Sequence, residues 1–117
     1  MKIRKARKKD FKEIAEILMK ESAKKPYNEK YNIKFALKEI NNLSKKELFI
    51  AQENKTILGF IASSITPDDK TKAYINELWL KPPYQKKGIG KQLVSFIENF
   101  YKNKGVKKIR LVAKTNA

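Results

Sequence analysis

The stretch from Tyr84 to Lys91 reads YQKKGIGK and combines two glycines with three lysines. Gly88 and Gly90 stand where an extended run has ended and an apolar run with helical spacing begins. The first turn of a helix leaves backbone N–H groups unpaired and carries the positive end of the helix dipole. Glycines let an anion approach those groups closely, and the lysines add positive charge. The stretch therefore favours a phosphate-binding loop over the alternative, an ordinary basic loop.

The residue types exclude several other chemistries. The 117-residue chain contains no Cys and no His, which excludes disulfides, thiolate nucleophiles, imidazole bases and the usual zinc sites, so we expect no metal. The Walker motif is missing, and Leu93 occupies the third glycine position of G-x-G-x-x-G. No apolar run is long enough to span a membrane, and no signal-type segment follows the basic N-terminus. We therefore expect a cytoplasmic protein with no membrane partner.

The formal net charge of +16 is the strongest feature of the composition. It favours polyanion partners such as nucleic acid or a phosphorylated cofactor. A generally lysine-rich composition explains the charge equally well, because the basic residues are spread along the chain. The sequence shows no helix-turn-helix, zinc finger or RNA-binding aromatic motif. A basic nucleic-acid-binding domain is therefore kept only as the least favoured alternative.

Periodic patterns along the chain predict the elements that must position the loop. Asp10 favours a helix N-cap, and Glu13 follows it in the capping-box position. Apolar residues then recur at helical spacing, whereas runs rich in β-branched and aromatic residues predict strands. We expect strands over Lys2–Arg7, Glu47–Glu53, Thr56–Ile65, Lys72–Leu80 and Lys107–Ala113, helices over Phe11–Ser22, Tyr31–Leu43 and from Gly88 to Gly105, and a turn over Thr66–Lys70.

The predicted order is β-α-α-β-β-β-α-β. A strand, helix and strand from Lys72 to Ala113 place two strands parallel, joined by a right-handed crossover. The hairpin-like connection at Asn54 and Lys55 makes earlier strands antiparallel. The predicted fold class is thus α/β, an α+β arrangement in which a mixed sheet is flanked by helices. We expect a single domain over residues 1–117.

The segment LWLKPPYQKKGIGKQLVSFIENFYKNKGVKKIRLVA resembles the acyl-CoA-binding core of the GNAT superfamily of N-acetyltransferases. The family signature, [Arg/Gln]-x-x-Gly-x-[Gly/Ala] at the start of a helix, matches Gln85–Gly90 without a gap. The opening IRKARKKDFKEIAEIL is similar to the first strand and helix of the family, and ILGFIAS to its third strand. The resemblance covers nearly the whole chain and agrees with the predicted element order.

This resemblance implies acetyl-CoA as cosubstrate, with the coenzyme A pyrophosphate on the loop N–H groups. It also implies that the last strand separates from its parallel neighbour, so that the backbone of Leu78 and Leu80 pairs with pantetheine. A bulge is expected near Glu77 to Trp79, because bulges re-aim residues beside active sites. The expected cofactor-binding residues are Leu78, Leu80, Gln85, Lys86, Lys87, Gly88, Ile89, Gly90 and Lys91.

The resemblance implies direct transfer of an acetyl group to a primary amine on a small molecule or a protein. The amine must lose a proton, and Glu77 is the candidate catalytic base, with a strand carboxylate paired to a lysine as the alternative. Trp79, Tyr27 and Tyr31 either line the acceptor cleft or pack in the core. The basic surface favours acidic or small neutral acceptors unless the cleft is locally acidic.

The family normally continues past the last strand with a further helix and two strands. Here the chain stops at Ala117, and Asn116 matches an asparagine that usually opens this segment. Two expectations follow. Coenzyme A binding tolerates the lack of this segment better than catalysis does, and the last strand has an unpaired edge that invites a homodimer or aggregation. The main alternative to an enzyme is therefore a catalytically inactive coenzyme A-binding or regulatory module.

Overall fold

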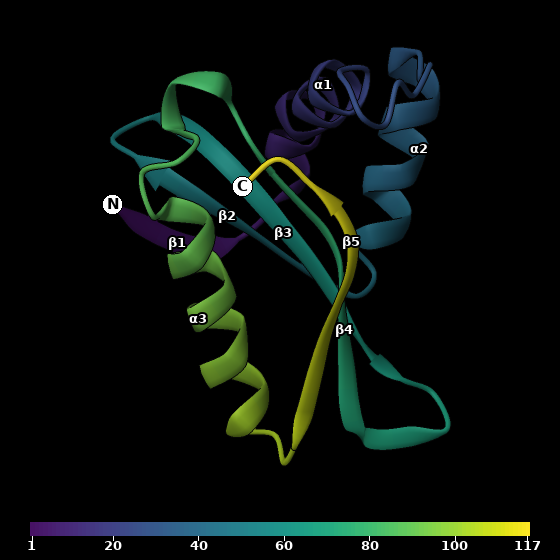
Figure 1. The fold of residues 1–117 in the computed structure, drawn as a ribbon, viewed down its shortest axis with the longest axis vertical. Coiled ribbons are helices and arrows are strands. Elements are labelled where there is room, and N and C mark those ends of the chain that lie inside the picture. Colours follow the sequence, from purple (N-terminus) through teal and green to yellow (C-terminus); the bar gives the residue numbers. More distant parts are fainter.

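The computed structural model describes the backbone of residues 1–117 and all side chains except those of residues 113 and 114 (Figure 1). The element order is β-α-α-β-β-β-α-β, as predicted, with two short 3-10 turns before α1 and α3. The strands are β1 (Lys2–Lys5), β2 (Glu47–Glu53), β3 (Thr56–Thr66), β4 (Asp69–Leu80) and β5 (Lys108–Thr115), and the helices are α1 (Phe11–Ser22), α2 (Ile33–Leu43) and α3 (Ile89–Lys102).

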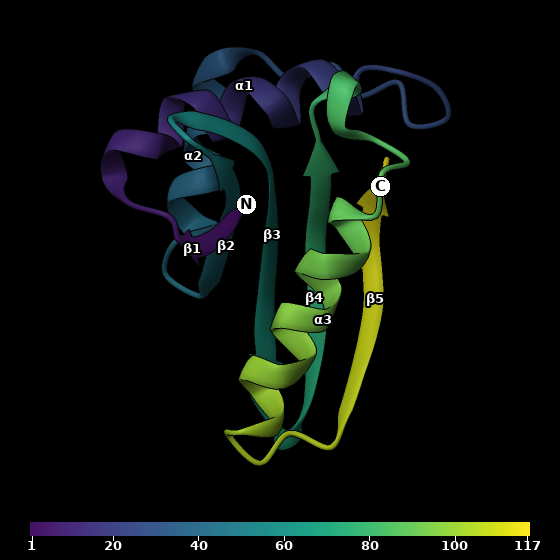
Figure 2. The ribbon, with the colours of Figure 1, turned by 90° about the vertical axis from the view of Figure 1, so that its left-hand side faces the viewer.

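The five strands form one mixed sheet in the order β1-β2-β3-β4-β5. Neighbours from β1 to β4 are antiparallel, and β4 pairs with β5 in parallel, which confirms the predicted mixed α/β sheet. α1 and α2 cover one face of the sheet, and α3 covers the other (Figures 1 and 2). The chain from β4 through α3 to β5 therefore forms one side of the molecule.

Two apolar clusters hold the helices to the sheet. One packs α1 and α2 against side chains such as Ile50, Phe60 and Trp79, and the other packs α3 against Ile61, Leu78 and Leu80. The central strand β3 contributes buried side chains to both clusters, which explains its nearly continuous apolar sequence. The core thus lies on both sides of β3 and β4.

Asp10 is the N-cap of α1, as predicted, but its side chain makes no capping hydrogen bond to this helix, so the predicted capping box with Glu13 is not formed. Asp10 has helical backbone angles (φ −89°, ψ −15°) because the 3-10 turn Lys8–Asp10 continues directly into α1. Its carboxylate accepts hydrogen bonds from the backbone N–H of Arg7 (2.8 Å) and from the guanidinium of Arg4 (2.9 and 3.1 Å). The helical segment is therefore capped one turn earlier than predicted, and Glu13 is free to contact another element.

Candidate active site

The residues from Gln85 to Lys91, here called the glycine loop, connect a 3-10 turn (Pro82–Tyr84) to α3. Gly88 is the N-cap of α3 and has a left-handed backbone conformation (φ 83°, ψ 1°), which a residue with a Cβ adopts only with strain. Lys86 also has positive φ, at 57°. Gly88 thus has a conformational role besides the close anion approach inferred from the sequence.

At the start of α3, Gly88 is exposed, whereas Gly90 is buried next to Ala117. The first intrahelical hydrogen bond runs from the N–H of Gln92 to the carbonyl of Gly88 (3.0 Å), so the N–H groups between them belong to the unpaired first turn. The side chains of Lys86, Lys87 and Lys91 are exposed around this turn. Backbone donors, the helix dipole and three ammonium groups therefore favour an anion here.

A cavity of about 290 Å³, here called the donor cavity, adjoins the glycine loop. Six of the nine predicted cofactor-binding residues line it, and the remaining three, Gln85, Lys87 and Ile89, do not. Val94, Leu111, Thr115 and Ala117 complete the wall, and the predicted residues in it are Leu78, Leu80, Lys86, Gly88, Gly90 and Lys91.

The predicted separation of β4 from β5 is wrong as far as Leu78, which still pairs with Thr115. Two positions further along β4, the side chain of Asn116 takes the place of a strand neighbour for Leu80. Its Oδ1 accepts from the N–H of Leu80 (2.8 Å), and its Nδ2 donates to the carbonyl of Leu80 (2.9 Å). The backbone groups expected to meet pantetheine at Leu80 are thus bonded to a side-chain amide.

The side chain of Gln85 lies away from the donor cavity. Its Nε2 donates to the carbonyl of Leu80 (3.1 Å) and to Oε1 of Glu21 (3.0 Å) on α1. Sequence reasoning gave Glu21 no role. A signal existed, because Glu21 falls on the same helix face as Ile14 and Ile17, where a carboxylate needs polar partners.

A β-bulge in β4 sets the direction of Glu77. In the pairing with β3, Ala62 lies opposite Glu77 and Ser63 lies opposite Ile75, so Asn76 is the additional residue. The bulge lies one residue before the predicted stretch. Because it shifts the alternation of β4, Glu77 shares the α1–α2 face with Trp79, whereas Ile75 and Leu78 both pack towards α3.

Glu77 has the electrostatics expected of a proton acceptor near neutral pH. Burial raises the pKa of its carboxyl to about 7; the hydrogen bond from Trp79 Nε1 to Glu77 Oε2 (3.0 Å) lowers it, and the charge of Glu39 raises it. The alternative reading, pairing with a lysine, has no support among the ion pairs of the described side chains. An amine bound beside Glu77 would therefore meet a carboxylate able to take a proton.

The aromatic residues proposed for the acceptor cleft are mainly packing residues. Trp79 is 1% exposed and belongs to the core. The rings of Trp79 and Tyr27 form a T-shaped contact, with 5.6 Å between their centroids and 75° between their planes. The Tyr27 hydroxyl bonds to the N–H and the carbonyl of Thr115. Tyr31 is half-buried and stacks on Phe35 at 4.9 Å; burial and the charges of Glu77 and Glu39 raise its pKa. Tyr31 thus remains a candidate for the cleft.

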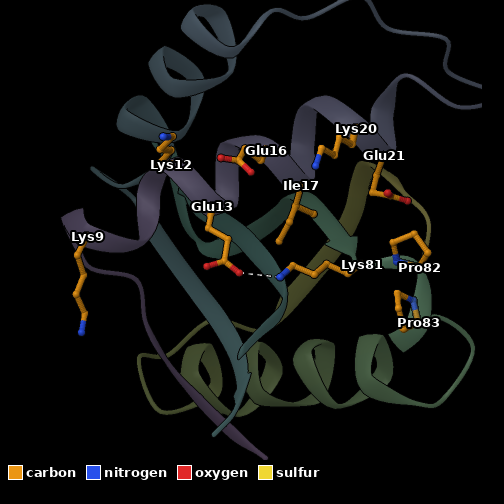
Figure 3. Close-up of a pocket in the computed structure, with 10 residues that line it drawn as sticks. All are labelled: Lys9, Lys12, Glu13, Glu16, Ile17, Lys20, Glu21, Lys81, Pro82 and Pro83. Carbon is orange, nitrogen blue, oxygen red and sulfur yellow. Dashed lines mark hydrogen bonds and ion pairs between the residues drawn. The ribbon is translucent and has the colours of Figure 1, made fainter. Parts of the chain in front are cut away.

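A larger cavity of about 610 Å³ lies between α1 and the segment that follows β4 (Figure 3). Its wall contains four lysines and three glutamates, and Lys81 Nζ bonds Glu13 Oε2 across it at 2.7 Å (Figure 3). None of the predicted site residues lines it. The donor cavity is smaller, but residues of the glycine loop form part of its wall.

The fold and the loop define an acyl-CoA N-acyltransferase-like domain, and comparisons with known proteins agree. Residues 11–117 match the Acetyltransferase (GNAT) family. The chain belongs to this family. A search of curated proteins finds no match.

Solved structures share the fold at low sequence identity. A possible acetyltransferase from Clostridium difficile 630 superposes with a TM-score of 0.83 at 18% identity, covering 97% of this chain and 79% of that one. An acetyltransferase from Vibrio fischeri gives 0.72 at 24% identity, with 97% and 96% covered. An aminoglycoside acetyltransferase from an uncultured soil metagenomic sample gives 0.70 at 20% identity, with 97% and 77% covered.

Two further observations apply to the described part of the chain. Its side chains form no group of three or more carboxylate, thiol or imidazole residues suited to a metal ion. No helix in it has both the length and the apolar character needed to cross a membrane.

Proposed function

We propose that this protein transfers an acetyl group from acetyl-CoA directly to a primary amine. The observation that carries the proposal is the donor cavity, because residues chosen from the sequence for coenzyme A converge on it beside the unpaired first turn of α3. Membership of the acetyltransferase family supports acyl transfer in general.

In the proposed complex, the N–H groups of the glycine loop hold the pyrophosphate and the exposed lysines neutralise its charge. Leu78 and Leu80 form the apolar wall of the cavity beside the pantetheine chain. Coenzyme A is too large for a cavity of about 290 Å³. Its nucleotide end therefore lies outside the cavity, over the basic surface of the loop.

We propose Glu77 as the base of the reaction. The ammonium group of the acceptor first gives a proton to the Glu77 carboxylate, directly or through water. The neutral nitrogen then attacks the thioester carbonyl carbon, the C–S bond breaks, and the thiolate of coenzyme A takes up the second proton that the nitrogen loses. A carboxyl with a pKa of about 7 suits this exchange at neutral pH. Because the donor cavity and Glu77 lie on opposite faces of β4, the thioester must pass β4 beyond its pairing with β5, where Asn116 bonds Leu80.

The proposed acceptor is a small cationic amine. The net charge of +16 repels cations from most of the surface, but the carboxylates of Glu77 and Glu39 interact and make this part of the α1–α2 face acidic. An ammonium group would lower the cost of keeping Glu77 ionised. The similar aminoglycoside acetyltransferase acts on a molecule of this class.

A catalytically inactive coenzyme A-binding module is the second candidate. It is favoured by one observation: the Leu80 backbone groups that pantetheine would need are bonded to Asn116, which must move before acetyl-CoA pairs there. A module that binds coenzyme A in the loop alone would leave this contact intact.

Two measurements separate these functions. Calorimetry with acetyl-CoA should show binding, and thermal melting should shift upwards with its concentration, since a ligand of the folded state stabilises it. Release of free thiol in the presence of an amine panel then tests transfer. Binding without turnover supports the module, and absence of both refutes the proposal. A cytoplasmic location and a homodimer stay predictions.

A further inference from the structure

Glu21, in the last turn of α1, is a buried carboxylate that the proposed mechanism does not use. Glu21 is 6% exposed. Among the residues whose side chains are described, Asp10 is the only other charged residue that is buried. Asp10 is neutralised by the guanidinium of Arg4, a local contact that stabilises the start of α1. Removing a carboxylate from water is costly unless donors satisfy it, so the partners of Glu21 indicate what it holds.

Three donors from three parts of the chain converge on Glu21. Lys24 Nζ bonds both carboxylate oxygens at 3.0 Å, and Oε1 also accepts from Gln85 Nε2 and from Asn116 Nδ2, each at 3.0 Å. Lys24 is half exposed, whereas the two amides come from the glycine loop and from the end of the chain beyond β5. The carboxylate thus joins α1 to the start of the glycine loop and to the chain beyond β5.

The same two amides also bond the last residue of β4. Gln85 Nε2 and Asn116 Nδ2 both donate to the carbonyl of Leu80, and Asn116 Oδ1 accepts from its N–H. Because Glu21 accepts from both amides, it fixes which way each amide group is turned. With that orientation, the amides continue the hydrogen bonding of β4 beyond its pairing with β5.

We infer that Glu21 is a positioning residue that fixes the start of the glycine loop, through Gln85, against α1 and Leu80. This inference deepens the proposed function and rests on it for its effect on coenzyme A. The N–H groups that follow Gln85 are held by the left-handed turns at Lys86 and Gly88, so their direction depends on where Gln85 is anchored. Loss of the anchor should therefore weaken phosphate binding without removing a phosphate contact.

Glu13 provides a matched control on the same helix. It bonds Lys81 at 2.7 Å, four residues before Gln85, so it also links α1 to the segment between β4 and α3 (Figure 3). The Glu13 and Lys81 side chains are 43% and 30% exposed, and an exposed pair of this kind contributes little. The same substitution at the two glutamates therefore separates a buried anchor from a surface contact.

The test compares Glu21→Met with Glu13→Met, after circular dichroism confirms that both fold. We expect Glu21→Met to raise the Kd for coenzyme A about tenfold and Glu13→Met to change it less than about twofold. Gln85→Met should act like Glu21→Met, and the double variant should lose little more, because the two side chains act through one contact. Glu21→Gln, which retains an acceptor oxygen, should recover part of the affinity.

A second readout does not require coenzyme A. NMR order parameters of the loop amides in the free protein should fall in Glu21→Met and stay unchanged in Glu13→Met. Equal order parameters and equal Kd values in these two variants would overturn the inference. If the wild-type protein binds no coenzyme A, the proposed function is refuted, and the order parameters alone decide whether Glu21 positions the loop.

Discussion

The glycine loop and the Glu77 region lie on opposite faces of β4 and depend on different parts of the protein. The loop uses backbone N–H groups and a left-handed glycine, features encoded within a few consecutive residues. The Glu77 region uses a side chain whose direction depends on a bulge and whose pKa depends on burial. Donor binding should therefore tolerate changes in the core that proton transfer does not.

Among the changes that separate the two regions, substitution of Glu77 should have the largest effect, and that effect is on turnover. Glu77→Gln should lower kcat by about 10²-fold or more while leaving the affinity for coenzyme A nearly unchanged, because only the proton acceptor is lost. In the wild type, activity should rise with pH through about 7 as the carboxyl ionises. A variant with an unchanged pH–rate profile would indicate that water, not Glu77, takes the proton.

The same variant makes a prediction for stability. The pKa of Glu77 is raised in the folded protein from 4.5 to about 7, so the folded state binds the proton more tightly than the unfolded state. The resulting stabilisation is complete below pH 4.5 and is lost as the pH rises through about 7. Glu77→Gln should therefore melt at a higher temperature than the wild type at pH 8, and the difference should shrink at pH 5.

Charge at the glycine loop should affect donor affinity next most strongly. A side chain at Gly88 meets open space but requires a strained backbone, so Gly88→Glu and Gly88→Gln carry the same conformational cost. We expect Gly88→Glu to weaken coenzyme A binding about tenfold more than Gly88→Gln, because only the carboxylate repels the pyrophosphate. Equal affinities by calorimetry would place the phosphates elsewhere.

The left-handed conformation of Gly88 predicts a smaller effect on stability. Gly88→Ala should destabilise the protein by about 1–2 kcal/mol, whereas Gly88→Asn should cost less, since Asn tolerates this conformation better. Urea denaturation of the two variants measures the difference. Equal stabilities would mean that the loop relaxes to another conformation.

The smallest expected effect concerns Tyr27, whose ring contacts Trp79 and whose hydroxyl bonds Thr115 at the donor cavity. Tyr27→Phe removes the hydroxyl's hydrogen bonds to Thr115 and keeps the ring, so we expect a loss of about 1 kcal/mol in the free energy of unfolding. The Kd for coenzyme A should change less than about twofold. A large change in Kd would show that the two regions are coupled through this residue.

The elements were predictable because their signals are local. Apolar periodicity and turn residues gave the correct order, with strand ends in error by a few residues; β4, for example, begins at Asp69, because the preceding turn contains only Pro67 and Asp68. The bulge was displaced by one residue because register is decided by pairing with β3 rather than by β4 itself. The network around Glu21 joins residues 64 and 95 positions apart in the chain, which no local pattern reveals.

The contact between Asn116 and Leu80 has a thermodynamic consequence. The carboxamide of Asn116 offers Leu80 one donor and one acceptor and keeps a second donor for Glu21, and pantetheine carries secondary amides that also offer N–H donors and carbonyl acceptors. If acetyl-CoA pairs with Leu80, pantetheine amides replace the amide of Asn116. Leu80 then keeps its number of hydrogen bonds, whereas Asn116 gives up its bonds to Leu80. The binding enthalpy should then come mainly from the phosphates, so affinity should depend strongly on salt concentration and only weakly on the length of the pantetheine arm.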